Sequence, residues 1–193
     1  MMINNLIEYN IKINIPDHLI TGVDFNYISK RHDIYFLKKG YSLYSNNSVI
    51  ILDNDGKELF NCEYINKGVV VYNKRNVPVI NTFIQNSRKQ YIYLGEDRNK
   101  IISTIKPSNY VKFEYEMEFY NKGTDSQEVL TIIYNAYKKE YSVYCDRDWE
   151  NETMICSFGF MDYSNFDSYI EVSPWVDYMQ MIGIVLCFRS LNI

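Results

Sequence analysis

The chain has 193 residues, of which 47% are hydrophobic and 16% aromatic, and this length suits one domain with one sizeable core. Its formal net charge of −4 argues against a dedicated nucleic-acid binder, because such a protein neutralises many phosphates with lysine and arginine. We therefore expect a single domain over residues 1–193, of which residues 1–29 are the least clearly defined segment.

Polar residues interrupt the N-terminal stretch 1–15, so it lacks the continuous apolar region of a secretory signal. The four cysteines lie far apart without a Cys-x-x-Cys pair, and only two histidines, His18 and His32, accompany them. This pattern indicates no structural zinc site. We expect a protein of the reducing cytoplasm with no metal and no cofactor.

From about residue 33 to 172 the chain consists of short β-branched or aromatic runs separated by polar turns, as in an all-β sandwich or barrel. The clearest hairpin turns at Asp53–Gly56, where Asp-Gly supplies the positive-φ residues of a tight turn. The same turn resembles the start of an EF-hand calcium loop, which requires a bidentate acidic residue at its twelfth position. That position holds Tyr64 and the flanks are predicted strands, so a plain turn is the better interpretation.

Residues 110–120 alternate apolar and charged side chains with a strict period of two, which places Val111 and Phe113 on a buried face and the charged residues on a wet one. No linker divides the series of strands, and no sequence repeat suggests a propeller or solenoid. The runs amount to about twelve strands in a meander of hairpins. The thirteen candidate runs are residues 11–15, 34–39, 49–52, 58–60, 68–73, 78–84, 90–95, 100–106, 110–120, 129–135, 140–145, 154–161 and 166–172.

The C-terminal stretch from about Pro174 to Ser190 predicts an α-helix, with Ser173 as its N-cap and Arg189 near its C-terminal end. Residues 181–188 carry no polar side chain, so no face of this helix is left for water. Either lipid or protein must enclose it. A membrane span requires about 20 predominantly apolar residues, and the uninterrupted run is much shorter, which favours protein over a C-terminal membrane tail.

A closed sheet of about twelve strands has a radius of roughly 12 Å, close to the sheet-to-helix packing distance of about 10 Å. One helix therefore fills such a barrel, and closure removes the edges that so many hairpins would expose. We predict a mainly β fold, a closed antiparallel barrel of about twelve strands around a buried hydrophobic C-terminal α-helix.

The stretch 169–177, which leads into the apolar helix through Pro174 and Asp177, resembles the tubby C-terminal-like superfamily, and most closely its LURP-one-related branch. Residues 45–106, with an Asp-x-Asp-Gly hairpin followed by a second hairpin, are similar to the opening strands of that family. The resemblance covers about residues 30–193 and implies a barrel around a central helix, in agreement with the pattern above.

Tubby proteins bind phosphoinositides and phospholipid scramblases associate with membrane lipids, so the resemblance implies contact with lipid. No stretch of this chain matches the tubby phosphoinositide motif, and the proline-rich extension and cysteine cluster of the scramblases are absent. Two hypotheses stay open. The first is a monomeric, non-enzymatic binding module for anionic phospholipid or phosphoinositide headgroups, cytoplasmic and peripheral at the membrane. The second is a protein-interaction or scaffold domain with no lipid ligand.

Basic pairs occur mostly at predicted turns or strand ends, where several could converge on a phosphate headgroup. Among them Lys74, Arg75, Arg88 and Lys89 are the candidate ligands, because they flank one predicted strand and meet if that strand bends or its neighbours bring them round. Ordinary solvated charges are the alternative. No nucleophile with a base and no glycine-rich phosphate loop is visible, so we expect no catalytic residues. The pairs are residues 30–31, 38–39, 74–75, 88–89 and 138–139.

Overall fold

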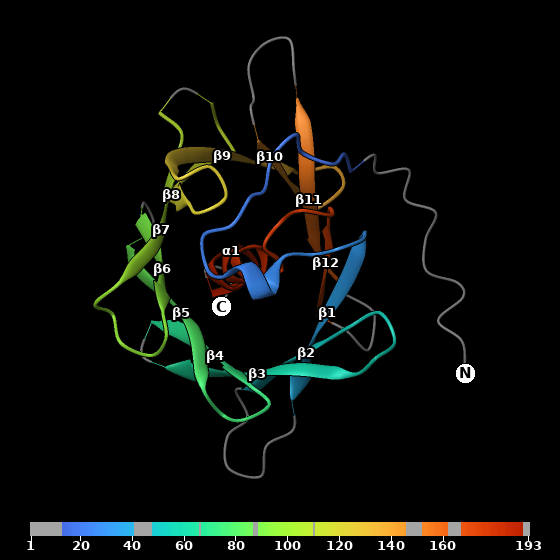
Figure 1. The fold of residues 1–193 in the computed structure, drawn as a ribbon, viewed down its shortest axis with the longest axis vertical. Coiled ribbons are helices and arrows are strands. Elements are labelled where there is room, and N and C mark those ends of the chain that lie inside the picture. The colour runs from blue at the N-terminus through green and yellow to red at the C-terminus, as the bar shows by residue number, and fades with distance from the viewer. Residues whose placement is uncertain are drawn as a thin grey trace.

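The structure is a computed structural model that describes residues 13–40, 48–65, 67–86, 89–109, 111–145, 152–161 and 167–190. Across these residues, twelve strands form one closed antiparallel barrel in which each strand pairs with its neighbours in sequence and β1 pairs with β12 to close the ring (Figure 1). One α-helix, α1, lies at the centre of this ring in the view of Figure 1. The predicted mainly β barrel around a C-terminal helix is confirmed.

The strands are β1 (Asp33–Gly40), β2 (Ser48–Leu52), β3 (Glu58–Ile65), β4 (Gly68–Asn73), β5 (Pro78–Asn86), β6 (Lys89–Leu94), β7 (Ile101–Pro107), β8 (Glu114–Asn121), β9 (Ser126–Asn135), β10 (Glu140–Cys145), β11 (Thr153–Phe160) and β12 (Ser168–Val172). A 3-10 helix, η1 (Phe25–Tyr27), precedes them and α1 (Tyr178–Ser190) follows them. The run predicted at 11–15 is wrong for its described part, since residues 13–15 are not a strand. Closure of the barrel through β1 and β12 leaves no edge for a further strand.

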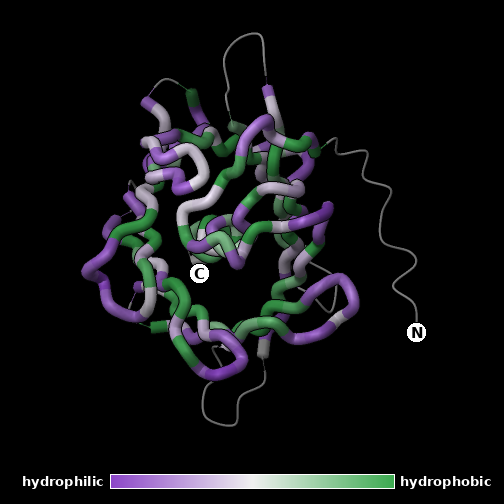
Figure 2. The backbone as a smooth tube through the Cα atoms, in the orientation of Figure 1, coloured by the Kyte–Doolittle hydropathy of each residue, from purple (hydrophilic) through white to green (hydrophobic). Residues whose placement is uncertain are grey.

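Helix α1 is the centre of the core. Its side chains from Met179 to Phe188 are buried on every side, against inward-facing residues of the barrel wall. The wall approaches so closely at Gly183 that a Cβ atom there would lie 2.8 Å from Ile92 Cδ1. Figure 2 shows hydrophilic stretches mainly in the loops that project from the barrel. Within the described residues, α1 included, we find no helix with the length and apolar character needed to cross a bilayer.

The helix begins later than the sequence predicts, so the assignment of Ser173 as N-cap is wrong. Residues 174–175 form a turn, and Asp177 caps α1 by accepting hydrogen bonds from the N–H groups two and three residues later, at 3.0 and 3.1 Å. The Ser173 hydroxyl instead donates to the Asn14 carbonyl at 2.8 Å. Backbone hydrogen bonds with the N-terminal segment hold the chain non-helical between Ser173 and Asp177.

That N-terminal segment, residues 13–32, is here called the strap because it crosses one end of the barrel, in front of α1 in Figure 1. Ile20 pairs in parallel with Val176, and Ser29 exchanges backbone hydrogen bonds with residues 175 and 176 at 2.8 and 2.9 Å. The end that carries the strap is the strap end. Since the sheet is an antiparallel meander, successive turns alternate between the strap end and the opposite end, here called the far end.

Candidate functional site

The candidate ligands chosen from the sequence are not gathered at one place. Lys74 and Arg75 lie exposed in the turn between β4 and β5 at the strap end, whereas Lys89 begins β6 at the far end. Strand β5, of nine residues, separates them, which is roughly 30 Å at about 3.3 Å per residue. Arg88 lies outside the described residues.

Several other lysines lie at the same end of the barrel as Lys89. They occupy connections that the meander brings to the same end of the barrel, and all are exposed. Lys89 and the basic pair 138–139 therefore belong to the same end of the molecule. The exposed lysines in these far-end connections, or directly next to one, are Lys67, Lys89, Lys112, Lys138 and Lys139.

Two far-end loops lie side by side and combine these lysines with exposed apolar side chains. The loops 108–113 and 136–139 adjoin because β8 pairs with β9 and the Tyr134 N–H donates to the Phe113 carbonyl at 2.9 Å. Val111 is 52% exposed, Phe113 is 47% exposed and Tyr137 is fully exposed. We call Val111, Lys112, Phe113, Tyr137, Lys138 and Lys139 the lysine–aromatic surface.

The sequence interpretation of Val111 and Phe113 as residues of a buried strand face is wrong. The pairing of β7 with β8 ends at Pro107 and Tyr115, and Phe113 has a φ of 66°. A positive φ is unfavourable for a bulky side chain and breaks the extended backbone. The alternating pattern therefore continues past the end of the barrel, where both side chains project into solvent.

Local contacts fix the shape of this surface. The Phe113 ring meets the Tyr134 ring edge-on at a centroid distance of 6.0 Å, and the Lys112 ammonium lies 4.9 Å from the Phe113 ring centroid. In the second loop the Asn135 carboxamide oxygen accepts hydrogen bonds from the N–H groups of Tyr137 and Lys138 at 3.0 and 3.2 Å. This Asx-type turn holds Tyr137 at the tip of the loop.

Lys112 and Lys138 differ from Lys106 in their surroundings. Lys106, on the barrel wall, lies 3.4 Å from a Glu116 oxygen and 2.5 Å from a Glu118 oxygen, so its charge is locally neutralised. Within the described ranges, no carboxylate lies at ion-pair distance from Lys112 or Lys138. On the lysine–aromatic surface, Lys112 and Lys138 thus present positive charge that is available to an external anion.

Known proteins that resemble this chain in sequence or in structure identify its family. The model of the LURP-one-related family matches residues 32–189. The chain belongs to the LURP-one-related family. An X-ray structure of a protein from Arabidopsis thaliana superposes with a TM-score of 0.67 and 16% sequence identity, over 90% of this chain and 99% of that one, which shows a common fold alone. None of the curated proteins matches this sequence.

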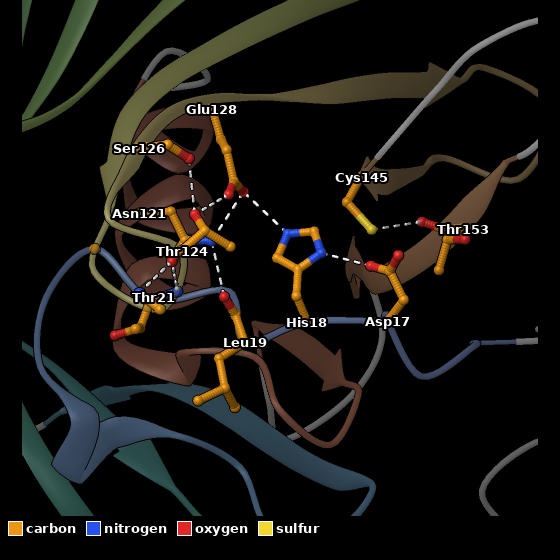
Figure 3. A network of polar contacts seen from close by, with 12 residues as sticks. Asp17, His18, Leu19, Thr21, Asn121, Thr124, Ser126, Glu128, Cys145 and Thr153 are labelled. Atoms are coloured by element: carbon orange, nitrogen blue, oxygen red, sulfur yellow. Dashed lines mark hydrogen bonds and ion pairs between the residues drawn. The ribbon is translucent and has the colours of Figure 1, made fainter.

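A second polar cluster joins the strap to the LURP-one-related barrel (Figure 3). His18 Nδ1 lies 2.5 Å from an Asp17 oxygen, and Nε2 lies 3.2 Å from a Glu128 oxygen. Asn121 donates to the same Glu128 oxygen at 2.9 Å and to the Leu19 carbonyl at 2.7 Å. Partial burial lowers the pKa of His18, but hydrogen bonds to the two carboxylates outweigh it and raise that pKa overall. With both ring nitrogens facing carboxylates, this histidine fastens the strap to β8 and β9.

A third cluster, on the barrel wall, contains a serine, a histidine and a glutamate, which are the residue types of a hydrolase triad. The three side chains do not contact one another in the order that a triad requires. One Glu171 oxygen lies 2.7 Å from His32 Nε2, and the other accepts a hydrogen bond from Ser157 Oγ at 3.4 Å. A catalytic triad places the histidine between nucleophile and acid, so that it can take the proton of the nucleophile. Here the Glu171 carboxylate lies between Ser157 and His32. The histidine therefore does not contact the serine hydroxyl, and this cluster is not arranged as a catalytic triad.

Metal binding was the other possibility that the sequence raised. In the part of the chain that the structure describes, no group of three or more histidine, cysteine, aspartate or glutamate side chains could hold a metal ion. At the Asp53 turn of this LURP-one-related domain, the carboxylate accepts hydrogen bonds from the N–H groups of Asp55 and Lys57 at 3.1 and 2.8 Å. Asp53 therefore supports the hairpin, and Gly56 takes the positive φ of 77° that the turn requires.

Proposed function

We propose that this protein is a non-enzymatic binding module that docks on anionic phospholipid surfaces through its far end. The supporting observation is that the described residues of the far-end loops 108–113 and 136–139 carry exposed lysines and no carboxylate, whereas the strap-end turns mix exposed lysines with aspartates and glutamates. Lysine ammonium groups attract phosphate headgroups as point charges, and phosphoinositides concentrate several negative charges in one headgroup. In this proposal the protein is a cytoplasmic monomer that reaches membranes peripherally.

The expected strength of the contact follows from the number of charges. Each lysine near an anionic surface contributes about 1 kcal/mol at physiological salt. Lys67, Lys89, Lys112 and Lys138 together would contribute about 4 kcal/mol, which corresponds to a dissociation constant of about 1 mM. Binding by these charges alone is weak, reversible and strongly dependent on ionic strength.

Vesicle sedimentation tests this proposal with a pair of charge-matched variants. Lys112→Glu/Lys138→Glu reverses two charges at the far end, and Lys74→Glu/Arg75→Glu reverses two at the strap end. We expect wild type and the strap-end variant to sediment with vesicles that contain about 30 mol% phosphatidylserine, or a few per cent phosphoinositide, but not with neutral vesicles. The far-end variant should lose at least about tenfold in affinity.

Each other result has a defined meaning. Equal loss in both variants would show that only overall charge matters, and loss in the strap-end variant alone would move the site to the turn between β4 and β5. Absence of binding to any anionic vesicle would refute the proposal.

A protein-interaction function is the second candidate, and one feature of the strap end favours it. Trp175 is exposed although its φ of 70° is unfavourable for a bulky residue, and Phe25 of η1 is exposed at the same end. Aromatic side chains of this kind anchor protein interfaces. If this function holds, Trp175→Ala and Phe25→Ala should abolish the capture of a reproducible partner from native extract, while Tyr137→Ser should leave it intact.

A further inference from the structure

The far end carries its exposed apolar side chains at the tips of two neighbouring loops. We infer that Val111, Phe113 and Tyr137 form a wedge that inserts into the boundary between headgroups and acyl chains of an anionic bilayer. This inference rests on the proposed function and adds an apolar component to a contact that lysines alone would make purely electrostatic.

Exposure and backbone geometry support the wedge. Phe113 is about half exposed, and its backbone has a positive φ of 66°. Lys139 has a positive φ of 54° at the equivalent place in the second loop, beyond the fully exposed Tyr137. Both loops therefore present an aromatic side chain to solvent, and in the first loop the aromatic residue itself has an unfavourable backbone conformation.

The distribution of charge selects a bilayer as the occupant. Lys112 lies between Val111 and Phe113 in sequence, and Lys138 follows Tyr137, so each apolar tip has an ammonium group beside it. A bilayer offers phosphate groups at the level of such lysines and an apolar phase a few ångströms deeper, and tyrosine is enriched at that boundary. Protein–protein interfaces are depleted in lysine, which makes a protein partner a poorer match for this surface.

The turn between β4 and β5, at the strap end, provides a control for the insertion of the wedge. Val77 lies in the turn between β4 and β5 at the strap end, and it is exposed and close in sequence to Lys74 and Arg75. This turn, like the wedge, combines basic residues with an exposed apolar side chain, but it has one apolar side chain and no aromatic ring. If any exposed apolar residue beside basic ones sufficed for insertion, Val77 would insert as well.

Site-specific labelling distinguishes these possibilities. All four native cysteines are buried, so Tyr137→Cys and Val77→Cys each create one exposed thiol for an environment-sensitive nitrobenzoxadiazole label. On vesicles with about 30 mol% phosphatidylserine, we expect the label at position 137 to shift to shorter wavelength, to brighten at least about twofold and to be quenched by spin-labelled lipid. The label at position 77 should not change. Unlabelled wild type treated with the same reagent checks that the native thiols stay unmodified.

The variant Tyr137→Ser separates the wedge from the electrostatic contact. It keeps every lysine, and removal of a fully exposed side chain leaves the fold intact, which an unchanged unfolding midpoint would verify. At low ionic strength we expect its affinity for anionic vesicles to stay within about threefold of wild type, whereas in about 0.5 M salt, where charges are screened, it should lose at least about fivefold.

Failure of the wedge and failure of the proposed function give different results. The wedge would be refuted if the fluorescence of the label at position 137 did not change on vesicles and Tyr137→Ser bound like wild type at every salt concentration. Electrostatic docking through the lysines would remain supported in that case. Response of the label at position 77 instead would place the docking face at the strap end and overturn both. No binding of wild type to anionic vesicles would also refute both.

Discussion

Asp177 is the residue whose substitution should reveal most about how this fold is held together. It is completely buried, and one of its oxygens accepts hydrogen bonds from the Thr21 hydroxyl at 3.1 Å and from the Val23 N–H at 2.9 Å. The other oxygen caps α1, with the Gln180 N–H at 3.1 Å. One carboxyl group therefore fastens the strap and the central helix to each other.

Burial raises the pKa of Asp177 from its ordinary value of 3.8 to about 6, although hydrogen bonds from the strap and from α1 favour the charged form. The folded protein then binds a proton more tightly than the unfolded chain does between these two values. The contribution of this group to stability is therefore fully present at low pH and is lost as pH rises through about 6. A shift of about two units corresponds to about 3 kcal/mol over the whole range.

The variant Asp177→Asn tests this reasoning, because an amide keeps the size and one acceptor but cannot titrate. We expect Asn to destabilise the protein at about pH 4.5, by about 1 to 3 kcal/mol for the acceptor that it lacks. The stability gap between wild type and variant should shrink by about 2 kcal/mol from about pH 4.5 to about pH 7.5. Urea unfolding at several pH values, followed by circular dichroism, measures the gap.

A gap that widens as pH rises would refute the argument. It would mean that the hydrogen-bond donors outweigh burial, so that the ionised carboxylate is the form the fold prefers. His18 is common to both proteins, so its own titration cancels from the comparison.

Three further predictions concern stability. His18→Gln should cost more stability near pH 6 than near pH 8.5, since the raised pKa of His18 gives a contribution that is lost as pH rises, and urea unfolding at about these two pH values checks it. Gly183→Val should destabilise by about 1 to 3 kcal/mol in the same assay, because a Cβ there would crowd Ile92. Deletion of residues 174–193 should abolish cooperative thermal unfolding, because the barrel would lose its centre; a soluble, cooperatively folded remainder would contradict this.

Much of the fold could be predicted from the sequence because its strongest signals are periodic. The apolar stretch 181–188 required complete enclosure, and the alternating runs supplied the enclosing sheet. The start of α1 could not be predicted in the same way. Capping preferences favoured Ser173, but the chain around Trp175 is held non-helical by hydrogen bonds with Ser29, which lies more than a hundred residues away in sequence.

The candidate site was harder to predict because nearness along the chain is a poor guide to nearness in a meander. Lys74 and Lys89 flank one strand, and turns on either side of one strand lie at opposite ends of the barrel. Turns separated by two strands lie at the same end, so a count of strands relates Lys89 to Lys112 and Lys138. The exposure of Phe113 had no comparable signal, since its apolar alternation continues that of β8.

The same geometry limits where any ligand can bind. Helix α1 and the inward side chains fill the barrel, and at Gly183 even a methyl group would collide with the wall. The strap covers the end of the barrel at which α1 begins, and the buried carboxyl group of Asp177 holds it there. A ligand can therefore bind only on the outside of the molecule, which includes the barrel wall, exposed strap-end residues such as Trp175 and the far-end connections that carry the lysine–aromatic surface. Substitutions in the far-end loops would therefore test the proposed membrane contact without disturbing α1, because no residue of the wedge contributes to the core.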